Sequence, residues 1–447
     1  MKIRVLIEAT KAEIIGNTDM DLEVTISTDT RTIKQGDFYL PLKGASFDGE
    51  KFIDQALEKG AVGSFCTKEL HISAGKGFDN RVILKVPDTL TAYLQLANYR
   101  RNKLNPIVVA VTGSSGKTTT KELVSSVISE KYKTFKTPLN HNNEIGFCQT
   151  VFEAPDDTEV LVLEMGMRGL GEIELLSKYA EPDISIISNV GTAHIGRLGS
   201  RENIAKAKCE IVSHQRGNIF IAHDDELIKK TVNFDGEKIF YSIKEVKITD
   251  KNAHYSKFEY KGNIYELNVG GDYNIENALA AINAGEKLSL TTEQIKQGLK
   301  KYKPIEKRWE GVKVNINGKV IEIINDSYNA NPESMKAFID TIFELYKNYT
   351  IILGDMGELG KDEIKYHSEL GTYINNKNNL NPNSDIISIG TLSKNITDSI
   401  TECKTHHFES IEEAIPFLKE NLQTSATLFL KASRSMKFEK IIEQLNS

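Results

Sequence analysis

The sequence predicts an α/β protein of three domains. At 447 residues the chain is too long for a single hydrophobic core, because a typical domain has about 150 residues. From residue 107 onward, apolar runs of strand length alternate with amphipathic segments of helix length, a pattern typical of a mainly parallel sheet covered by helices. A glycine-containing loop joins the first of these strands to its helix, as in nucleotide-binding sheets.

The composition excludes several classes of function. The hydrophobic (40%) and charged (26%) fractions are those of an ordinary globular protein. The net charge of -6 offers no broad basic surface, so we expect no nucleic-acid partner. The four cysteines are widely spaced without a C-x-x-C pair, which argues against disulfides and zinc and indicates a reducing cytoplasm. No apolar run of about 18 residues occurs, so we expect no membrane span.

The first predicted domain covers residues 1–86 and mixes short strands with helix. Residues 38–42 form a strand-like run and residues 51–59 a helix-like run. Pro87 is a natural break, after which Leu90, Leu94 and Ala97 recur at helix spacing and predict a helix over 89–101.

The second predicted domain covers residues 87–304, and the third covers residues 305–447. Each has its own strand series, and the polar, glycine-containing stretch 301–311 is the expected hinge between them. The predicted strands of the second domain are 107–111, 160–163, 184–187 and 219–222. Those of the third domain are 320–324, 350–353, 386–389 and 428–430, with a helix over 332–346.

The string TGSSGKTTT follows the first strand of the second domain and predicts an ATP site. Glycines at 113 and 116 let backbone N–H groups approach phosphate oxygens, and the following helix adds positive charge from its N-terminus. Lys117 would reach the β- and γ-phosphates, and the Thr118 hydroxyl would bind Mg²⁺. The alternative is a plain strand-to-helix turn, because Val111 stands where the standard motif has glycine. The predicted nucleotide-binding residues of the loop are Gly113, Ser114, Ser115, Gly116, Lys117, Thr118 and Thr119.

Further candidate residues follow the next strands. Glu164 ends the strand at 160–163, where a parallel sheet would present a carboxylate to the phosphate edge as a magnesium ligand. Asn189 and His194 follow the strand at 184–187, and His194 could bind a second Mg²⁺ or a phosphate. Lys208 lies on a probable helix. The alternatives are a solvated strand-end glutamate, a surface histidine and a solvated lysine.

Several long strings resemble the Mur ligase family. They are TPLNHNNEIG from residue 137, GDYNIENALAA from 271, KRWEG from 307, DSYNANPESM from 326 and LKASRSMKFE from 430. In the N-terminal segment, STDTRTIKQGDFYLPLKG followed by FDG is similar to the family's UDP-binding domain. Tyr273 stands where the family usually has histidine, Ala432 where it has glycine, and Glu50 where a histidine often follows FDG.

This resemblance implies further site residues. It implies that Asn274, Asn277, Arg308, Asp326 and Asn329 contact the nucleotide. It also implies that Lys208 is converted by carbon dioxide to a carbamate that binds Mg²⁺, so that Lys117, Glu164, His194 and Lys208 carry the chemistry. The implied substrate-binding residues are Thr30, Arg31, Asn140, Asn142 and Asn143.

The resemblance also implies an activity. It indicates a ligase with ATP and Mg²⁺ that adds D-alanyl-D-alanine to UDP-N-acetylmuramoyl-tripeptide through an acyl phosphate, in peptidoglycan synthesis and hence in cell shape and division. The C-terminal domain would be Rossmann-like, and the protein a cytoplasmic monomer. Alternatives are the ligase that adds the third stem residue, a folylpolyglutamate synthetase, or a non-catalytic nucleotide-binding regulator. The third residue of the tripeptide, diaminopimelate or lysine, stays open.

Overall fold

The computed structural model describes residues 1–44, 47–68, 81–139, 141–305, 307–316, 318–378, 380–382, 384–422 and 426–446. Contacts within the chain define two compact units. One is Met1–Pro106 with Thr137–Glu159, and the other is Ile107–Lys136 with Val160–Ser447. This division is coarser than the three predicted domains, whose boundaries at 86/87 and 304/305 stay predictions.

The first unit contains a five-stranded sheet of order β1-β5-β4-β3-β2, parallel except for the pairing of β1 with β5. Its strands are β1 (Glu13–Ile15), β2 (Ile26–Ser27), β3 (Phe38–Tyr39), β4 (Gly63–Cys66) and β5 (Val82–Lys85). Its helices are α1 (Ile3–Thr10), η1 (Gly49–Phe52), α2 (Ile53–Glu58), α3 (Thr89–Leu104) and α5 (Glu144–Glu153). The predicted helix at 89–101 is confirmed as α3, which begins at the cap Asp88.

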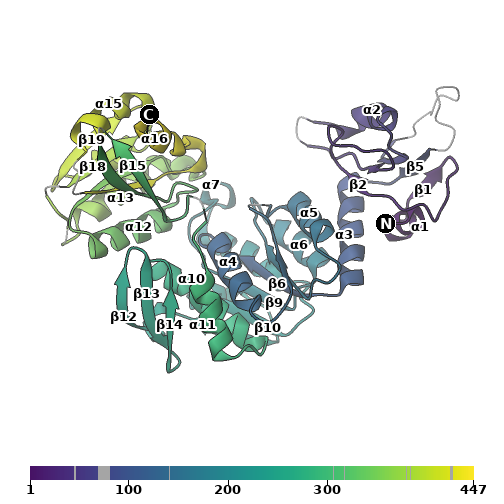
Figure 1. The fold of residues 1–447 in the computed structure, drawn as a ribbon, viewed down its shortest axis with the longest axis horizontal. Helices are drawn as coiled ribbons and strands as arrows, with labels where there is room; N and C mark the ends of the chain where they lie inside the picture. The colour runs from purple at the N-terminus through teal and green to yellow at the C-terminus, as the bar shows by residue number, and fades with distance from the viewer. Residues whose placement is uncertain are drawn as a thin grey trace. The chain divides into compact units, whose positions relative to one another are not determined.

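The second unit begins with a parallel six-stranded sheet of order β11-β10-β9-β6-β8-β7. Figure 1 labels β6, β9 and β10 of this sheet. Its strands are β6 (Ile107–Thr112), β7 (Thr134–Lys136), β8 (Val160–Glu164), β9 (Ile184–Ile187), β10 (Ile219–His223) and β11 (Glu237–Tyr241). The associated helices are α4 (Lys117–Ile128), α6 (Glu172–Ala180), α7 (Ile195–Leu198), α8 (Arg201–Cys209), η2 (Glu210–Val212), α9 (Glu226–Thr231), η3 (Ile243–Glu245), α10 (Asp272–Lys287) and α11 (Thr292–Lys301). The strands predicted here are confirmed.

Helices α4 and α10 cover this parallel sheet and position the loop that precedes α4. Helix α4 packs on β6, β7 and β8, while α10 packs on β10 and β11 and also against α4. Strands β6, β8 and β9 are buried along nearly their whole length, as expected for strands covered on both faces. The order β9-β6-β8 brings the carboxyl ends of these three strands together at one edge.

A three-stranded antiparallel sheet follows in the chain and was not predicted. Its strands are β12 (Lys247–Asn252), β13 (Tyr255–Tyr260) and β14 (Asn263–Leu267). Along β13 buried and partly exposed residues alternate, with Phe258 and Tyr260 facing the core. These strands contain few apolar residues because only one face is buried, so their sequences lack the continuous apolar runs that identified the parallel strands.

The C-terminal part of the second unit contains a six-stranded sheet of order β15-β16-β20-β17-β18-β19, parallel except for the β15–β16 pair. Its strands are β15 (Glu310–Ile316), β16 (Lys319–Asn325), β17 (Tyr349–Gly354), β18 (Asp385–Ile389), β19 (Lys404–Phe408) and β20 (Thr427–Lys431). Its helices are α12 (Pro332–Leu345), η4 (Gly360–Asp362), α13 (Glu363–Asn375), α14 (Lys394–Thr397), α15 (Ile411–Asn421), η5 (Arg434–Met436) and α16 (Glu439–Leu445). The predicted strands and the helix at 332–346 are confirmed.

Helices cover both faces of this C-terminal sheet. Ile351 and Leu353 on β17 pack in the same core as Phe338 of α12, while Ile352 between them packs in a separate core with Leu418 of α15. Successive strand residues point to opposite faces, so a strand buried on both sides reads as a continuous apolar run. This burial explains why β17 could be recognised from its sequence.

Trp309, the single tryptophan of the chain, lies at the end of the predicted hinge in the larger hydrophobic core. Its ring is 3% exposed and makes edge contacts with Tyr273 of α10 and Phe338 of α12. Its indole N–H donates to the carbonyl of Ala253 at 2.8 Å. Trp309 therefore joins α10, the β12–β13 turn and the C-terminal sheet. Within the residues that the structure describes, no helix is long and apolar enough to cross a membrane.

We predict that Trp309→Ala lowers the free energy of unfolding by about 3–5 kcal/mol, because it leaves a cavity among aromatic rings. Trp309→Phe keeps an aromatic ring but loses the indole donor, and should lower the free energy of unfolding by about 1 kcal/mol. Urea unfolding followed by far-UV circular dichroism measures both. Ile264→Ala, at a side chain that is 49% exposed, is the control and should stay within about 0.5 kcal/mol of the parent. An unchanged Trp309→Ala midpoint would contradict the assigned packing.

Candidate active site

The loop between β6 and α4 has the backbone geometry of a phosphate-binding loop. Gly116 has a φ of +74° and is the N-cap residue of α4. A Cβ atom at Gly116 would lie 2.4 Å from the Asn277 side-chain oxygen, and one at Gly113 would lie 1.9 Å from the Ser188 hydroxyl. Only glycine therefore fits both positions, and the helix N-terminus opens directly behind the loop.

The end of β9 holds the loop in place. The Ser115 amide donates to the side-chain oxygen of Asn189 at 2.9 Å, and the Asn189 side-chain amide donates back to the Ser115 carbonyl at 3.0 Å. Ser188 donates to the same carbonyl at 2.5 Å, and the Gly191 amide donates to the Ser114 hydroxyl at 2.9 Å. Asn189, singled out in the sequence, is thus part of the frame of the loop.

Lys117 and Thr118 open helix α4. The Lys117 amine donates to the Gly113 carbonyl at 2.9 Å and so folds back over the loop. Burial lowers the pKa of Lys117, while the negative charge of Glu164 acts in the opposite direction. The Thr118 hydroxyl accepts a hydrogen bond from Arg308 at 2.9 Å, and Thr119 beside it is buried. The predicted arginine of the hinge therefore reaches the phosphate loop.

Glu164 lies at the carboxyl end of β8. In the sheet it is paired with Val111 of β6, just before the phosphate loop. Its side chain is buried, and one oxygen is 3.9 Å from the amine of the fully buried Lys121. Lys121 also contacts Glu122 at 3.1 Å. The strand-end carboxylate is therefore located where the sequence placed it, beside a lysine that the sequence analysis missed.

Lys208 is buried in α8, whereas its neighbour Lys206 is exposed. Burial lowers the pKa of the Lys208 amine well below its ordinary value, and the positive charge of Lys117 lowers this pKa further. The alternative of a solvated lysine is therefore wrong for Lys208.

His194 lies at the start of α7 with a φ of +66°. Its Nδ1 atom is 2.6 Å from a carboxylate oxygen of Glu358, and this contact lowers the pKa of Glu358. Over the described ranges, no three His, Cys, Asp or Glu side chains are grouped so that they could hold a metal ion. The predicted metal contact of His194 stays a prediction.

The two asparagines of α10 lie in different surroundings. Asn277 contacts the loop, because its side-chain oxygen faces Gly116 and accepts from Thr120 at 3.1 Å. Asn274 is buried and donates to the Gly270 carbonyl at 2.7 Å. Tyr273, which replaces the family's usual histidine, packs on Trp309. Asn277 therefore adjoins the predicted phosphate site, and the predicted nucleotide contact of Asn274 stays untested.

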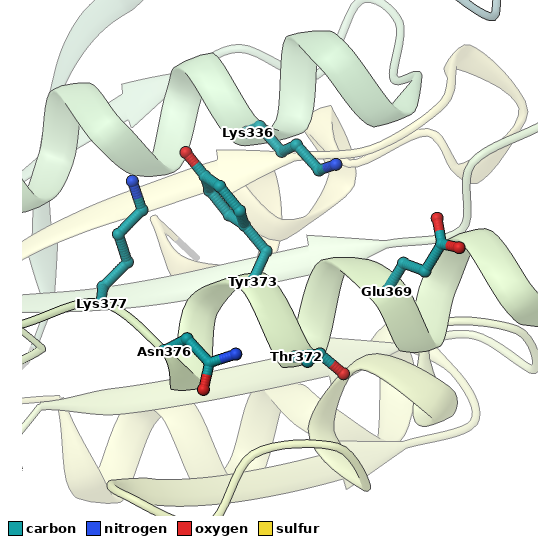
Figure 2. Close-up of a pocket in the computed structure, with 6 residues that line it drawn as sticks. All are labelled: Lys336, Glu369, Thr372, Tyr373, Asn376 and Lys377. Atoms are coloured by element: carbon teal, nitrogen blue, oxygen red, sulfur yellow. The ribbon is translucent and has the colours of Figure 1, made fainter.

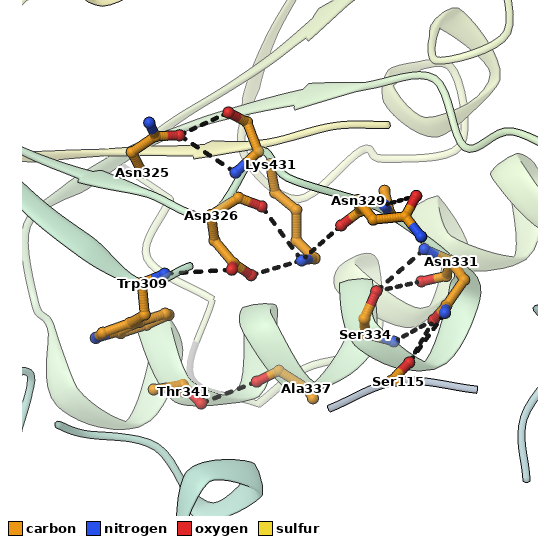
Figure 3. A network of polar contacts seen from close by, with 12 residues as sticks. Ser115, Trp309, Asn325, Asp326, Asn329, Asn331, Ser334, Ala337, Thr341 and Lys431 are labelled. Carbon is orange, nitrogen blue, oxygen red and sulfur yellow. Dashed lines mark hydrogen bonds and ion pairs between the residues drawn. The ribbon is translucent and has the colours of Figure 1, made fainter. Parts of the chain in front are cut away.

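Asp326 anchors the turn that precedes α12 (Figure 3). One of its carboxylate oxygens is 2.5 Å from the amine of Lys431, which is 4% exposed and also donates to the Asn329 carbonyl at 3.2 Å. The other oxygen accepts the Trp309 amide at 3.2 Å. Because Trp309 follows Arg308, this hydrogen bond fixes the segment that carries Arg308.

Two residues of α12 and its cap were missed as site residues. Asn331 donates to the Ser115 hydroxyl at 2.9 Å, and Glu333 accepts from the Thr192 hydroxyl at 2.9 Å. The string around Asn331 indicates a turn and the start of a helix. This prediction is correct, because Asn331 is the N-cap residue of α12.

In the first unit, the predicted substrate residues lie in loops and at a helix start. Arg31 is exposed and pairs with Asp29 at 2.6 Å, and this contact lowers the pKa of Asp29 to about 2. The Thr30 carbonyl accepts from Lys59 at 2.8 Å. Asn143 caps α5, with Asn142 directly before it, while Asn140 lies outside the described residues.

A hollow on the surface of the C-terminal part lies between α12 and α13 (Figure 2). Tyr373 within it donates to the carboxylate of Asp340 at 2.7 Å, and the amines of Lys377 and Lys336 lie 4.2 Å and 5.3 Å from the centre of its ring. These side chains interact with one another, and the hollow contains none of the candidate catalytic residues.

A phosphate loop at the edge of one parallel sheet, joined to a second α/β sheet by an arginine-bearing hinge, defines a nucleotide-binding enzyme of the P-loop type. The family model for the Mur ligase middle domain matches residues 111–285. The model for the Mur ligase glutamate ligase domain matches residues 307–434, and that for the catalytic domain of the Mur ligase family matches residues 24–105. The chain belongs to the Mur ligase family.

Relatives and solved structures agree with this assignment. The chain is 35% identical to the UDP-N-acetylmuramoyl-tripeptide–D-alanyl-D-alanine ligase of Bacillus subtilis over 94% of this chain and 92% of that protein. It is 33% identical to the ligase of the same name from Synechocystis, over 96% and 94%. The structure of MurF from Acinetobacter baumannii matches with a TM-score of 0.88 at 28% identity, covering 99% of this chain and 98% of that one.

The MurF ligase of Thermotoga maritima, solved in complex with ADP, matches with a TM-score of 0.81 at 26% identity, covering 95% of this chain and 97% of that one. The predicted family and the predicted α/β fold of three domains are therefore confirmed.

We predict that Gly116→Ala weakens ATP binding by at least about tenfold, or about 1.4 kcal/mol, because the added methyl group would displace Asn277. Gly171→Ala is a matched control, since Gly171 is also a helix N-cap with a φ of +83° but has no atom within 4 Å of the point where a Cβ atom would lie. Titration with a fluorescent ATP analogue measures both. Equal affinities for the two variants would contradict the role assigned to the loop.

Proposed function

We propose that the chain is an ATP-dependent amide ligase that adds D-alanyl-D-alanine to UDP-N-acetylmuramoyl-tripeptide through an acyl phosphate. The observation that carries this proposal is the phosphate loop with Lys117, which follows the strand whose end pairs with Glu164, in a chain similar over nearly its whole length to ligases of that name. The reaction would provide a peptidoglycan precursor, with consequences for cell shape and division.

The chemistry needs an activated acid, because a carboxylate resists attack by an amine. The terminal oxygen of the tripeptide carboxylate would attack the γ-phosphorus of ATP in line, releasing ADP and forming an acyl phosphate. The amine of D-alanyl-D-alanine would then attack the carbonyl carbon, lose a proton and expel phosphate. The loop amides and Lys117 would bind the phosphates, and Arg308 would approach them from the hinge beside Thr118.

The residues at the loop fit a magnesium ion. Mg²⁺ prefers hard oxygen donors and usually shares its shell with substrate phosphates and water. The Thr118 hydroxyl and the Glu164 carboxylate are such donors, and both belong to the edge where β6 and β8 end. When bound, Mg²⁺ would neutralise charge on the triphosphate.

Lys208 is proposed as a carbamate. Carbon dioxide reacts with an uncharged amine to give a carbamate anion and a proton, and the lowered pKa of Lys208 favours the uncharged form. A carbamate anion at Lys208 would also attract the Lys117 amine, whereas a protonated Lys208 would repel it. It would offer oxygen atoms as metal ligands, with His194 proposed as a ligand of a second ion.

The other proposed contacts complete the substrate sites. Asn274, Asn277, Asp326 and Asn329 are proposed near the nucleotide, while Thr30 and Arg31 would bind the UDP moiety. The asparagines at 140, 142 and 143 are proposed to contact the substrate. All four cysteines are free thiols, which supports a reducing cytoplasm as the location. The monomeric state stays a prediction.

The other ligases of the family remain the alternative reactions. A solved UDP-N-acetylmuramoyl-L-alanyl-D-glutamate–2,6-diaminopimelate ligase is 17% identical and FolC of E. coli 16%, so these two matches show the fold alone. An acceptor screen distinguishes these reactions. The protein is incubated with ATP, each acid substrate and each amine, and phosphate release is measured. Both the diaminopimelate and the lysine tripeptide belong in the screen.

We predict that Lys117→Ala lowers the rate of phosphate release with tripeptide and D-alanyl-D-alanine by about a hundredfold or more, because the phosphates lose their charged donor. Lys206→Ala, at an exposed position of α8, is the control and should retain the parent rate. Release of phosphate by the parent only with a different acid and amine would contradict the proposed substrates. A near-normal Lys117→Ala rate would contradict the assigned loop.

We predict that protein equilibrated with ¹³C-bicarbonate shows a carbamate ¹³C resonance that is absent from Lys208→Ala and present in Lys206→Ala. Lys208→Ala should also lose ligase activity, while Lys206→Ala should keep it. The resonance tests the modification without any substrate. An identical spectrum for the parent and Lys208→Ala would rule out a carbamate at this lysine.

A further inference from the structure

The side chain of Asn331 contacts both helix α12 and the phosphate loop. Its oxygen accepts the Ser334 amide at 2.9 Å, which caps helix α12, and the Ser334 hydroxyl accepts the Asn331 amide in return. Its side-chain nitrogen donates to the Ser115 hydroxyl at 2.9 Å, and the same hydroxyl lies 3.3 Å from the Asn331 side-chain oxygen (Figure 3). Asn331 is 5% exposed and Ser115 is partly exposed, so this contact between α12 and the phosphate loop is partly shielded from water.

Ser115 has the complementary arrangement. Its backbone amide and carbonyl are held by Asn189, and Ser188 donates to the same carbonyl. Its hydroxyl is therefore the group of this residue that reaches α12. A change in the position of this hydroxyl when phosphate binds would act on Asn331, which contacts it directly.

Neighbouring contacts also join the C-terminal part of the unit to the segments around the phosphate loop. Glu333, in the first turn of α12, accepts from Thr192 after β9, and a Cβ atom at Gly191 would lie 2.8 Å from the Glu333 carboxylate. Arg308 reaches Thr118 on the other side of the loop. Helix α12 thus begins against the segments that frame the loop, with Asn331 contacting the loop itself.

We propose that Asn331 is a positioning residue that couples the state of the phosphate loop to the placement of α12, and thereby of the C-terminal sheet, during ligation. The inference rests on the proposed function for its kinetic test. Asn331 suits this role because an amide caps a helix with its oxygen while its nitrogen donates to a second partner. A serine at 331 would preserve the cap but is too short to reach Ser115.

The test compares Asn331→Ser, Ser115→Ala and the double variant in the full chain. We expect Asn331→Ser to lower kcat for ligation about five- to tenfold, as for the loss of one partly buried hydrogen bond, with a melting temperature near that of the parent. The Kd of AMP-PNP, measured directly, should change less than about twofold, because Asn331 is not in the phosphate cradle. The double variant should lose no more than the more impaired single variant, since both substitutions remove one contact.

A second readout needs no acceptor. Hydrogen exchange at the first turn of α12 should slow when AMP-PNP and Mg²⁺ bind to the parent, and this effect should disappear in Asn331→Ser. Ligation by Asn331→Ser at the parent kcat, or multiplied losses in the double variant, would overturn the coupling. Equal nucleotide-dependent protection in the parent and Asn331→Ser would overturn it too. A parent that shows the protection but forms no amide would instead contradict the proposed function alone.

Discussion

The loop from Gly113 to Gly116 depends on close packing that leaves no room for side chains. Gly116 faces the Asn277 oxygen and Gly113 faces the Ser188 hydroxyl, so the loop passes between α10 and the end of β9. Asn189 then holds Ser115 by its amide and its carbonyl. These contacts prepare the backbone amides for an anion before any ligand arrives, which lowers the cost of ordering the site on binding. Helices α4 and α10, Arg308 and Lys117 all lie around this loop.

Buried charge sets the second constraint. Lys121 and Lys208 are buried and Lys117 is partly buried, and Glu164 provides a negative charge that lies 3.9 Å from the Lys121 amine and acts on Lys117. Burial of a cation without a nearby anion is costly, and burial lowers the pKa of the Lys117 and Lys208 amines. A triphosphate, and a carbamate on Lys208, would each add the missing negative charge. The site is therefore suited electrostatically to a polyanionic ligand.

The C-terminal sheet fixes the turn after β16, and through it the segment that carries Arg308. The nearly buried pair of Asp326 and Lys431 joins β16 to β20, and Asp326 also accepts the Trp309 amide. Trp309 has a φ of +55°, a backbone conformation that costs energy in a non-glycine residue and persists only where surroundings hold it. The adjacent Arg308 packs over the Tyr328 ring at 4.2 Å and reaches Thr118. The aspartate of the family string thus holds the residue next to the arginine.

The local sequence determined the phosphate loop, the parallel strands and the strand-end carboxylate, because glycine conformation and continuous apolar burial leave signals within a few residues. The antiparallel strands β12 to β14, buried on one face, left no such signal. Nor did the contacts of Lys121 with Glu164, His194 with Glu358 or Asn331 with Ser115, whose partners lie 43, 164 and 216 positions apart in the printed sequence. Tertiary structure decided these pairs, because a polar side chain selects its partner by distance and burial in the folded chain and not by its position in the sequence.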